Sequence, residues 1–297
     1  MNIGIVGGGS IGLLLCSYIS EKHDVTLYVR RDDQKNALLE HGVQLYEQSA
    51  FKRNVRPHIS LIEHITTHDC LFICVKQPEI LHLVQLLSSV PSNMPIIFLQ
   101  NGMGHIESIK QLTHPTYVGV VEHGASRMND VRVNHLGKGK MVLATLFNGD
   151  KEKAQQLVDN IHQPTFPFQL ANDWQTLLAN KLIVNAVINP LTALFDVPNG
   201  DILENPHIHS IARRLCEEVS GALQLNIEHS WDLVCMIANN TKHNTSSMRA
   251  DVLANRETEI EAMNGYIAKI DPTRHLNYWI YISILALTER GRNYDAR

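Results

Sequence analysis

One ammonium group and two amides recur at a fixed spacing in the second half of the chain. Lys181, Asn185 and Asn189 stand at positions i, i+4 and i+8 of a stretch rich in Leu, Ile and Val, so they share one stripe of a helix. A solvated helix face is the ordinary explanation for such a stripe. Solvated faces, however, favour Glu, Lys and Gln over repeated Asn, which is a poor helix former. The stripe therefore suits a cavity that binds a small polar anion.

Two further polar stretches follow this stripe. Ser246 and Ser247 lie near an expected helix start, where capping of the helix is the usual role of a serine. The glutamates Glu257, Glu259 and Glu261 would each by default be a surface charge. We expect Glu259 three turns beyond the two serines, on one long helical segment over 247–270.

A glycine-rich loop follows the first apolar run of the chain. The run Ile3-Gly4-Ile5-Val6 is followed by Gly7-Gly8-Gly9-Ser10-Ile11-Gly12 and then by a helical pattern. A strand before, a helix after and a second strand at the right distance make GxGxxG a dinucleotide fingerprint, where a flexible loop is the alternative. Gly7 would permit the tight turn, Gly9 the approach of a pyrophosphate and Gly12 the packing of helix on strand. The helix N-terminus would offer free N–H groups to the phosphates.

The end of the second strand indicates which dinucleotide binds. NAD sites usually place Asp or Glu there for the ribose 2′-hydroxyl, whereas NADP sites place Arg near the 2′-phosphate. The strand Asp24–Val29 is followed by Arg30 and Arg31, which favours NADPH, although which of the two holds the phosphate stays open. Asp32 and Asp33 could instead bind the ribose. We interpret them as the start of the next helix, where negative charge is favoured.

The order of apolar patterns predicts two domains. Expected strands alternate with helical patterns in the first half, which indicates a Rossmann-type doubly wound parallel sheet; the strands are 2–6, 25–29, 70–75, 96–99 and 117–121, and the helices 11–20, 33–40 and 79–88. Residues 131–146 predict two strands in a hairpin around Gly137, followed by a helix from 150 to about 162. Helical periodicity dominates from Trp174 onward, over 175–195, 208–225 and 247–270. We expect an NADP-binding domain over 1–168 and an all-helical substrate-binding domain over 169–297.

Composition and charge narrow the class of protein. A hydrophobic fraction of 44%, a charged fraction of 19% and a net charge of -4 are ordinary for a globular enzyme and give no electrostatic reason to expect nucleic acid or an anionic membrane as partner. No secretory signal or membrane-length apolar run is visible, so we expect a cytoplasmic protein. The five scattered cysteines and sixteen histidines form no metal-binding pattern, and no metal is expected. His41, His58, His64 and His68 are interpreted as surface residues.

The chain resembles the 2-dehydropantoate 2-reductase (ketopantoate reductase) family. The resemblance spans nearly the whole chain and rests on the glycine loop and on blocks in the family's order, namely 74–76, 100–104, 181–193, 198–200, 244–248 and 257–265. The block Lys-x3-Asn-x3-Asn-Pro-Leu-Thr-Ala is highly specific, whereas the glycine loop is not. One departure is Arg249-Ala250, where a Leu-Gln pair is expected.

The resemblance implies reduction of ketopantoate to pantoate by NADPH, in pantothenate and coenzyme A biosynthesis. It implies Lys181 as the general acid, with substrate-binding residues Asn101, Lys181, Asn185, Asn189, Asn199 and Ser247. The cofactor would be held by Gly7, Gly8, Gly9, Ser10, Ile11, Gly12, Arg30, Lys76, Asn101, Ala125 (through its backbone) and Glu259. Lys76 could instead be an ordinary surface lysine, and Asn101 could instead be part of a turn.

Two other functions fit the same residues. A reductase of the same architecture could act on another branched 2-keto acid, because the sequence does not size the pocket. A non-catalytic NADPH sensor could keep the loop for binding only, although the Lys181 stripe and Glu259 argue against it. The chain could be a monomer or a homodimer. The apolar segment Tyr278–Ile282 could be core or a dimer contact, and core is the expectation.

Overall fold

The computed structural model describes the backbone of residues 1–294 and the side chains of residues 1–289. The chain forms two compact units. We call the first, Met1–Gln100 with Ile106–Leu177, the Rossmann unit, and the second, Asn101–His105 with the chain from Leu178 onward, the helical unit. The units therefore divide within the first turn of a helix rather than after residue 168, and a short loop from the first half of the sequence belongs to the second unit.

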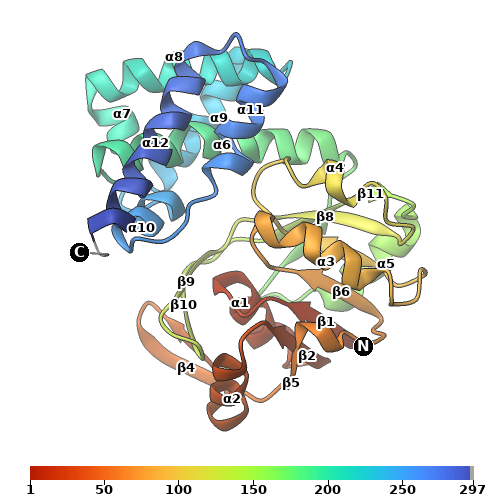
Figure 1. Cartoon of the computed structure of the whole chain (residues 1–297). Coiled ribbons are helices and arrows are strands. Elements are labelled where there is room, and N and C mark those ends of the chain that lie inside the picture. The colour runs from red at the N-terminus through yellow and green to blue at the C-terminus, as the bar shows by residue number, and fades with distance from the viewer. Residues whose placement is uncertain (295–297) are drawn as a thin grey trace. The chain divides into compact units, whose positions relative to one another are not determined.

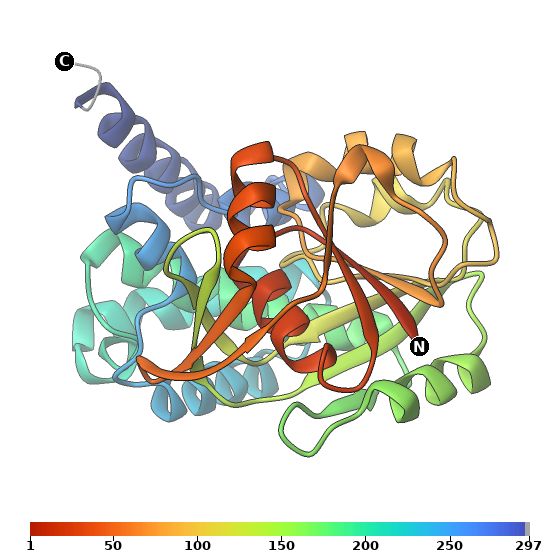
Figure 2. The same cartoon turned by 90° about the horizontal axis from the view of Figure 1, so that it is seen from below.

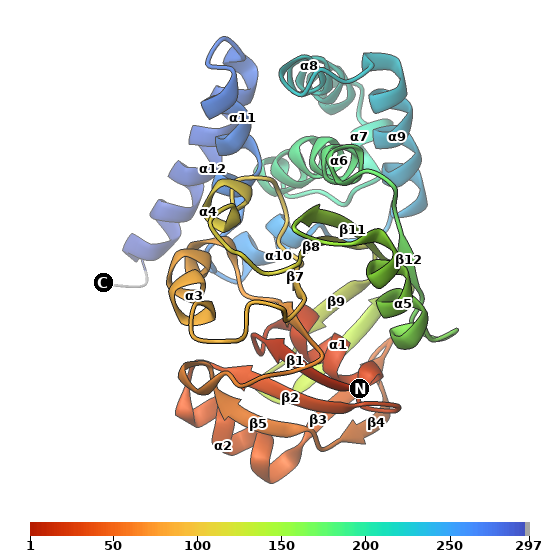
Figure 3. The ribbon, with the colours of Figure 1, turned by 90° about the vertical axis from the view of Figure 1, so that its right-hand side faces the viewer.

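A large sheet forms the centre of the Rossmann unit. Its eight strands run in the order β12-β11-β8-β7-β6-β1-β2-β5. They are β1 (Asn2–Val6), β2 (Asp24–Val29), β5 (His58–Leu61), β6 (Cys70–Ile73), β7 (Ile96–Phe98), β8 (Thr116–Val121), β11 (Met141–Phe147) and β12 (Phe168–Leu170). Neighbours from β5 to β8 are all parallel, and Figure 3 shows β1, β2 and β5 side by side. This order of six parallel strands is that of dinucleotide-binding sheets, so the predicted doubly wound fold is confirmed.

A smaller sheet, which the sequence did not indicate, packs on helix α1 (Ser10–Ile19). It consists of β4 (Ala50–Val55), β3 (Val43–Glu47), β10 (Arg132–Gly137) and β9 (Gly124–Arg127), in that order; Figure 1 shows β9 and β10 side by side. Helix α1 contacts β1 and β2 of the large sheet and β3, β9 and β10 of the small one. Every residue from Gly12 to Ile19 is buried. A helix covered on both sides needs no polar face, which explains the run Leu13-Leu14-Leu15-Cys16.

The predicted hairpin around Gly137 is wrong, although both of its strands exist. Strand β10 pairs with β3 and β9 of the small sheet, whereas β11 runs antiparallel to β8 of the large sheet. The four residues from Gly137 to Lys140 carry the chain from one sheet to the other. Met141 to Ala144 are all buried, so β11 gains more apolar contact in the core of the large sheet than a two-stranded hairpin could offer.

Short helices complete the Rossmann unit. They are η1 (Ile62–His64), η2 (Gln77–Glu79), α2 (Asp32–His41), α3 (Ile80–Leu87), α4 (Ile106–Ile109) and α5 (Lys151–Ile161). The Asp150 side chain caps α5 by accepting a hydrogen bond from Lys153 N at 2.9 Å, as an N-cap aspartate does. The expectation that His68 lies on the surface is wrong. It is buried, with Nδ1 2.8 Å from Asn2 Oδ1 and Nε2 2.8 Å from the Tyr28 hydroxyl.

The described part of the helical unit contains no strand. Its elements are α6 (Trp174–Phe195), α7 (Asp201–Glu204), α8 (Pro206–Ala222), α9 (Ile227–Asn240), α10 (Ser247–Leu253), η3 (Ile260–Ala262), α11 (Asn264–Ile270) and α12 (His275–Tyr294). Figure 2 shows α12, dark blue, as one continuous helix. By length and composition alone α6 could cross a membrane, which the sequence did not lead us to expect. However, 78% of its most apolar window is buried, as in the core helix of a globular domain.

A proline inside α6 is accommodated by a buried asparagine. Pro190 has no N–H to donate to the carbonyl of Ala186, four residues earlier. That carbonyl instead accepts a hydrogen bond from Asn264 Nδ2 at 3.0 Å. Asn264 and Asn277 are fully buried and also bond to each other, through Asn264 Nδ2 to Asn277 Oδ1 (2.9 Å) and Asn277 Nδ2 to the Asn264 carbonyl (3.0 Å). The pair thus ties α11 and α12 to the middle of α6.

The expectation of one long helical segment over 247–270 is wrong, because the chain forms three separate helical pieces there. Helix α10 ends at Leu253, and Asn255 has the left-handed φ of 50° that commonly ends a helix. The chain resumes helical geometry only at Ile260, so Glu259 lies at the start of η3 rather than on a continuous helix with Ser247.

The segment Tyr278–Ile282 on α12 is core in part only. Ile280 is fully buried, but Tyr278 and Trp279 are more than half exposed, at 52% and 57%. The expectation of a core segment thus holds for one face of the helix.

Candidate functional site

The glycine loop joins β1 to α1, and its geometry explains two of its glycines from within the protein. Gly7 has a φ of 113° and donates its N–H to the Tyr28 carbonyl at 2.8 Å, a conformation that L side chains rarely adopt. A Cβ on Gly12 would lie 1.8 Å from the Gly7 carbonyl oxygen. Any side chain there would therefore push α1 away from the turn.

Gly9 differs, because a Cβ at this position would meet nothing within 4 Å. Packing within the protein does not require a glycine here, whereas the close approach of a pyrophosphate would. Gly9 is also the N-cap of α1 and offers no side chain to the first N–H groups of the helix. Ser10 and Ile11 form the first turn, so their N–H groups lie at the positive end of the helix dipole. The loop thus fits a dinucleotide.

Arg30 and Arg31 follow β2 and have different partners. Arg30 Nη1 lies 2.5 Å from Glu79 Oε1, and its side chain is 66% exposed. Arg31 is the N-cap of α2 and pairs with Asp33, in the first turn of that helix, at 2.7 Å. Asp33 is thus engaged by an arginine, as we expect if the aspartates begin α2 rather than bind a ribose.

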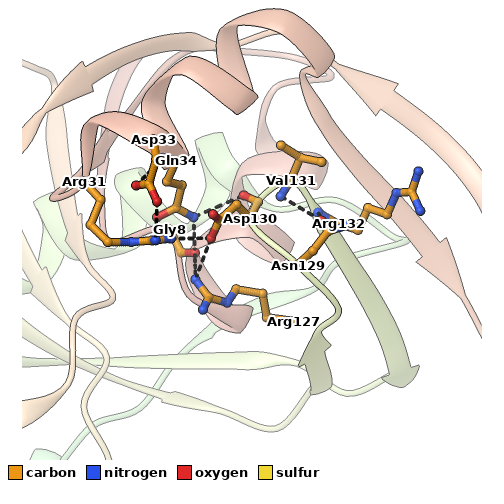
Figure 4. A network of polar contacts seen from close by, with 9 residues as sticks. All are labelled: Gly8, Arg31, Asp33, Gln34, Arg127, Asn129, Asp130, Val131 and Arg132. Carbon is orange, nitrogen blue, oxygen red and sulfur yellow. Dashed lines mark hydrogen bonds and ion pairs between the residues drawn. The ribbon is translucent and has the colours of Figure 1, made fainter.

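A network of polar contacts joins this corner to the turn between β9 and β10 (Figure 4). The Arg31 guanidinium also pairs with Asp130. The buried Gln34 side chain donates to the Gly8 carbonyl at 2.8 Å and to the Asp130 carbonyl at 3.1 Å. Arg127 Nη1 lies 3.5 Å from both the Gly8 carbonyl and Asp130 Oδ1. The small sheet therefore supports the glycine loop through its polar turn.

The other expected cofactor residues of the Rossmann unit lie at the ends of strands. Lys76 is exposed and directly precedes η2, just after β6. Ala125 lies on β9 opposite His135 of β10, in the small sheet. Gln100, which the sequence did not single out, follows β7 and donates its side-chain amide to the carbonyls of Ile73 (3.0 Å) and Val75 (2.9 Å). It thereby holds the carboxyl end of β6, the edge at which open α/β sheets bind ligands.

The expected substrate residues of the helical unit gather along α6. Lys181 is partly buried, whereas Asn185 and Asn189 are buried, in a helix whose other residues from Leu182 to Ala193 are buried as well. The stripe is therefore not a solvated face. Asn189 Nδ2 lies 3.4 Å from Ser247 Oγ, which places an amide and a hydroxyl side by side.

Asn101 and Glu259 meet beside the same stripe. Asn101 Nδ2 donates to Glu259 Oε2 at 2.8 Å, and Asn101 Oδ1 lies 3.5 Å from Asn185 Nδ2. The next residue, Gly102, has a φ of 78°, and a Cβ on it would lie 2.0 Å from the Ala262 carbonyl oxygen. The loop at 101–105 can therefore approach η3 only with a glycine at this position.

The two neighbouring serines have different roles. Ser246 is the N-cap of α10, accepting from Arg249 N at 3.1 Å, and its hydroxyl lies 2.7 Å from Thr192 Oγ1. The Ser247 hydroxyl lies beside Asn189 instead. The departure at Arg249 also has a structural reason, because Arg249 Nε binds Asp196 Oδ1 at 2.9 Å, just beyond the end of α6.

Asn199 lies in the turn before α7 and is tied to the end of α9. Its Nδ2 donates to Thr241 Oγ1 at 3.0 Å and its backbone N–H to the Asn244 carbonyl at 3.1 Å. Its buried Oδ1 has no hydrogen-bond partner among the described residues. A buried amide oxygen without a donor is a place where a ligand hydroxyl would gain most.

Comparison with known proteins identifies the family of the chain. The sequence model of "Ketopantoate reductase PanE/ApbA" matches residues 3–147, and that of its C-terminal domain matches residues 173–276. The chain belongs to the ketopantoate reductase family. It is 39% identical to the 2-dehydropantoate 2-reductase of Bacillus subtilis (strain 168), over 99% of both chains. It is 35% identical to that of Listeria innocua, over 89% of this chain and 87% of the relative.

Solved structures agree with this assignment. The crystal structure of a probable 2-dehydropantoate 2-reductase from Bacillus subtilis superposes with a TM-score of 0.87 at 37% identity, covering 97% of this chain and 100% of the other. A D-mandelate dehydrogenase solved with NADH and anilino(oxo)acetate reaches a TM-score of 0.90 at 19% identity, covering 98% and 99%. At that identity the second likeness shows the fold alone.

Several residues of this arrangement were missed by sequence reasoning. Gln34, Arg127 and Asp130 contact the glycine loop or its neighbours, yet they follow no periodic pattern. The place of Arg127 and Asp130 depends on the pairing of β10 with β3, which are far apart in the chain, whereas Gln34 lies on α2. A signal did exist for Asn264, because a proline inside a helix leaves a carbonyl that needs another donor.

Proposed function

We propose that this protein reduces ketopantoate to pantoate with NADPH, in the pathway to pantothenate and coenzyme A. The family and the names of the curated relatives support this reaction. The observation that carries the proposal is the line of Lys181, Asn185 and Asn189 on a buried helix, with the Ser247 hydroxyl beside it. Such a line offers one positive charge and several neutral hydrogen-bonding groups to an anion.

The chemistry of a 2-keto acid matches these groups. When bound, NADPH supplies the hydride. The keto oxygen gains negative charge as its carbon is reduced, and the Lys181 ammonium stabilises that charge and donates its proton to the oxygen. Asn185, Asn189, Asn199 and Ser247 hold the carboxylate and hydroxyl of the substrate without adding a competing charge. Asn101 takes part in this set through its contact with Asn185.

The Rossmann unit would hold the dinucleotide. The glycine loop from Gly7 to Gly12 would bind the pyrophosphate at the start of α1, and Arg30 the 2′-phosphate through charge-assisted hydrogen bonds. Lys76 and the backbone of Ala125, in the same unit, would also serve the cofactor. The resemblance implies a cofactor role for Asn101 and Glu259 as well, which belong to the helical unit. The nicotinamide class of cofactor agrees with neighbours solved with NADH, and the phosphorylated form is our proposal from the two arginines.

A spectrophotometric assay tests the reaction and separates the alternatives. NADPH oxidation is followed with ketopantoate, with other branched 2-keto acids and with a phenyl-substituted 2-keto acid. We expect ketopantoate to give the highest kcat/KM and NADPH to be used better than NADH. Faster turnover of another keto acid would move the substrate to that compound, and dinucleotide binding without any turnover would favour the sensor function. The proposed partner is a small molecule, and we propose a cytoplasmic location.

A further inference from the structure

One carboxylate in the Rossmann unit is shared by two arginines from separate elements. Asp130 Oδ1, in the turn between β9 and β10, pairs with Arg31 at the start of α2 and lies 3.5 Å from Arg127 Nη1. Arg31 also pairs with Asp33 at 2.7 Å. Figure 4 shows the Arg31 and Arg127 side chains both reaching Asp130, Arg31 from the left of the view and Arg127 from below. In this structure both cations are therefore directed at one anionic atom.

The cluster lies at the corner of the Rossmann unit where β2 ends. In dinucleotide-binding sheets the end of β2 faces the ribose 2′ position of the bound adenosine, and Arg31 stands two residues after β2. Arg127 and Gln34 both approach the Gly8 carbonyl, so the cluster adjoins the glycine loop. A 2′-phosphate bound there would meet the same guanidinium groups that now hold the Asp130 carboxylate.

The two anions would compete for these donors. A phosphate monoester carries about −1.5 to −2 charges near pH 7 and three acceptor oxygens, and arginine binds it in a forked geometry. The Asp130 carboxylate uses an Nη group of each arginine and would repel a phosphate placed beside it. A 2′-hydroxyl carries no charge, so it would be affected far less.

We propose that the Asp130 carboxylate takes the place of the cofactor's 2′-phosphate between Arg31 and Arg127. It holds these two side chains in place until the 2′-phosphate displaces it. This inference rests on the proposed use of NADPH, and it adds Arg31 and Arg127 to Arg30 as residues that set the preference. Only the side chain needs to rotate. The backbone of the turn is held separately, by Asn129 Oδ1 accepting from Val131 N (3.0 Å) and Arg132 N (2.9 Å) and by Gln34 donating to the Asp130 carbonyl.

The test measures binding by calorimetry, without turnover. The ligands are adenosine 2′,5′-bisphosphate and 5′-AMP, which differ only in the 2′-phosphate, and then NADPH and NADH. Asp130→Asn keeps the size of the side chain and removes the competing charge. We expect it to tighten binding of the two 2′-phosphorylated ligands by about tenfold, the equivalent of about 1.4 kcal/mol, and to leave 5′-AMP and NADH within about twofold. Asp130→Ser should change affinity in the same direction and serves if the first variant does not fold.

Two further variants separate this role from the alternatives. Asp32→Asn removes the same charge from the first turn of α2 and should have a much smaller effect if displacement, rather than overall charge, matters. Arg127→Gln should weaken the 2′-phosphorylated ligands alone. Equal weakening of all four ligands by Arg127→Gln would mean that Arg127 only supports the Gly8 carbonyl and would overturn its assignment to the phosphate.

The inference and the proposed cofactor fail in different ways. Unchanged or weaker binding of the bisphosphate by both Asp130 variants overturns the inference, even if the wild-type protein prefers NADPH. The wild-type protein could instead prefer NADH while Asp130→Asn binds the bisphosphate more tightly. This result would overturn NADPH as the cofactor but would still support competition between Asp130 and a 2′-phosphate.

Discussion

The side-chain amide of Asn101 donates a hydrogen bond to a carboxylate oxygen of Glu259, 2.8 Å away and 158 positions along the chain. A carboxylate accepts hydrogen bonds and donates none when ionised, so it fixes which end of the amide faces it. The Asn101 oxygen is thereby turned toward Asn185, at 3.5 Å. Glu259, expected from the resemblance to serve the cofactor, thus also orients an asparagine beside the α6 stripe.

The first prediction concerns the proposed proton donor. Lys181→Met should lower kcat by roughly 10²–10⁴, the usual span for lost acid–base catalysis, while NADPH binding measured by fluorescence stays near normal. Glu259→Gln should lower kcat less and also disturb ligand binding. Near-normal turnover by Lys181→Met would mean that water or another group delivers the proton.

A second prediction concerns Arg30. Arg30→Ala should raise the KM for NADPH strongly and leave NADH kinetics nearly unchanged, because only the contact with the 2′-phosphate is lost. Glu79→Gln is a matched control that removes the partner of Arg30 and keeps the guanidinium. Steady-state kinetics with both cofactors decide the matter. If both cofactors weaken equally in Arg30→Ala, this arginine is structural.

A third prediction separates substrate from cofactor in the helical unit. Asn189→Ala should raise the KM for the keto acid more than it weakens NADPH binding, because its amide lies beside Ser247 on the proposed substrate line. The matched control is Asn239→Ala, on the exposed surface of α9. Wild-type kinetics in Asn189→Ala would return this residue to a packing role.

A fourth prediction concerns the proline in α6. Asn264→Leu leaves the Ala186 carbonyl without its donor and should lower the free energy of unfolding by about 2–3 kcal/mol, as expected for a buried unsatisfied group. Pro190→Ala restores a backbone N–H to that carbonyl, so Asn264→Leu should cost less in the Pro190→Ala background. Urea unfolding of the four proteins measures this coupling. Equal costs in both backgrounds would show that the two residues act independently.

A fifth prediction is a dependence of stability on pH. Burial lowers the pKa of His123 to about 4, with His135 adding to the effect; His123 stacks on Phe166 and accepts from Gly139 N at 3.1 Å. Between pH 6.5 and 4 the unfolded chain binds this proton and the folded chain does not, so stability falls as the pH falls, by up to about 3 kcal/mol. His123→Gln should flatten urea stability over this window. An unchanged slope would mean that other groups govern acid unfolding.

The sequence predicted the parts of the fold that depend on local pattern. Six of the eight strands of the large sheet, the glycine turn and the α6 stripe each follow from periodicity or from residue types within a short window. The two edge strands, β5 and β12, were not predicted. The small sheet could not be predicted in this way, because β3 and β10 pair across nearly ninety positions and their strands carry no distinct turn signal. The break after α10 rests on Asn255 alone, with no Gly or Pro to mark it. The Asp130 cluster follows from the small sheet and was missed with it.

The assignment of Asn101–His105 to the helical unit has a consequence for synthesis on the ribosome. These five residues emerge long before α6 and η3, on which Asn101 and Gly102 depend for their contacts. Domains tend to fold as units while the chain is still being made, starting from the N-terminus. The Rossmann unit should therefore form first, with this loop awaiting partners that are translated only later. A stalled chain in which the residues up to 177 have left the ribosome should hold the large sheet but not the ordered loop.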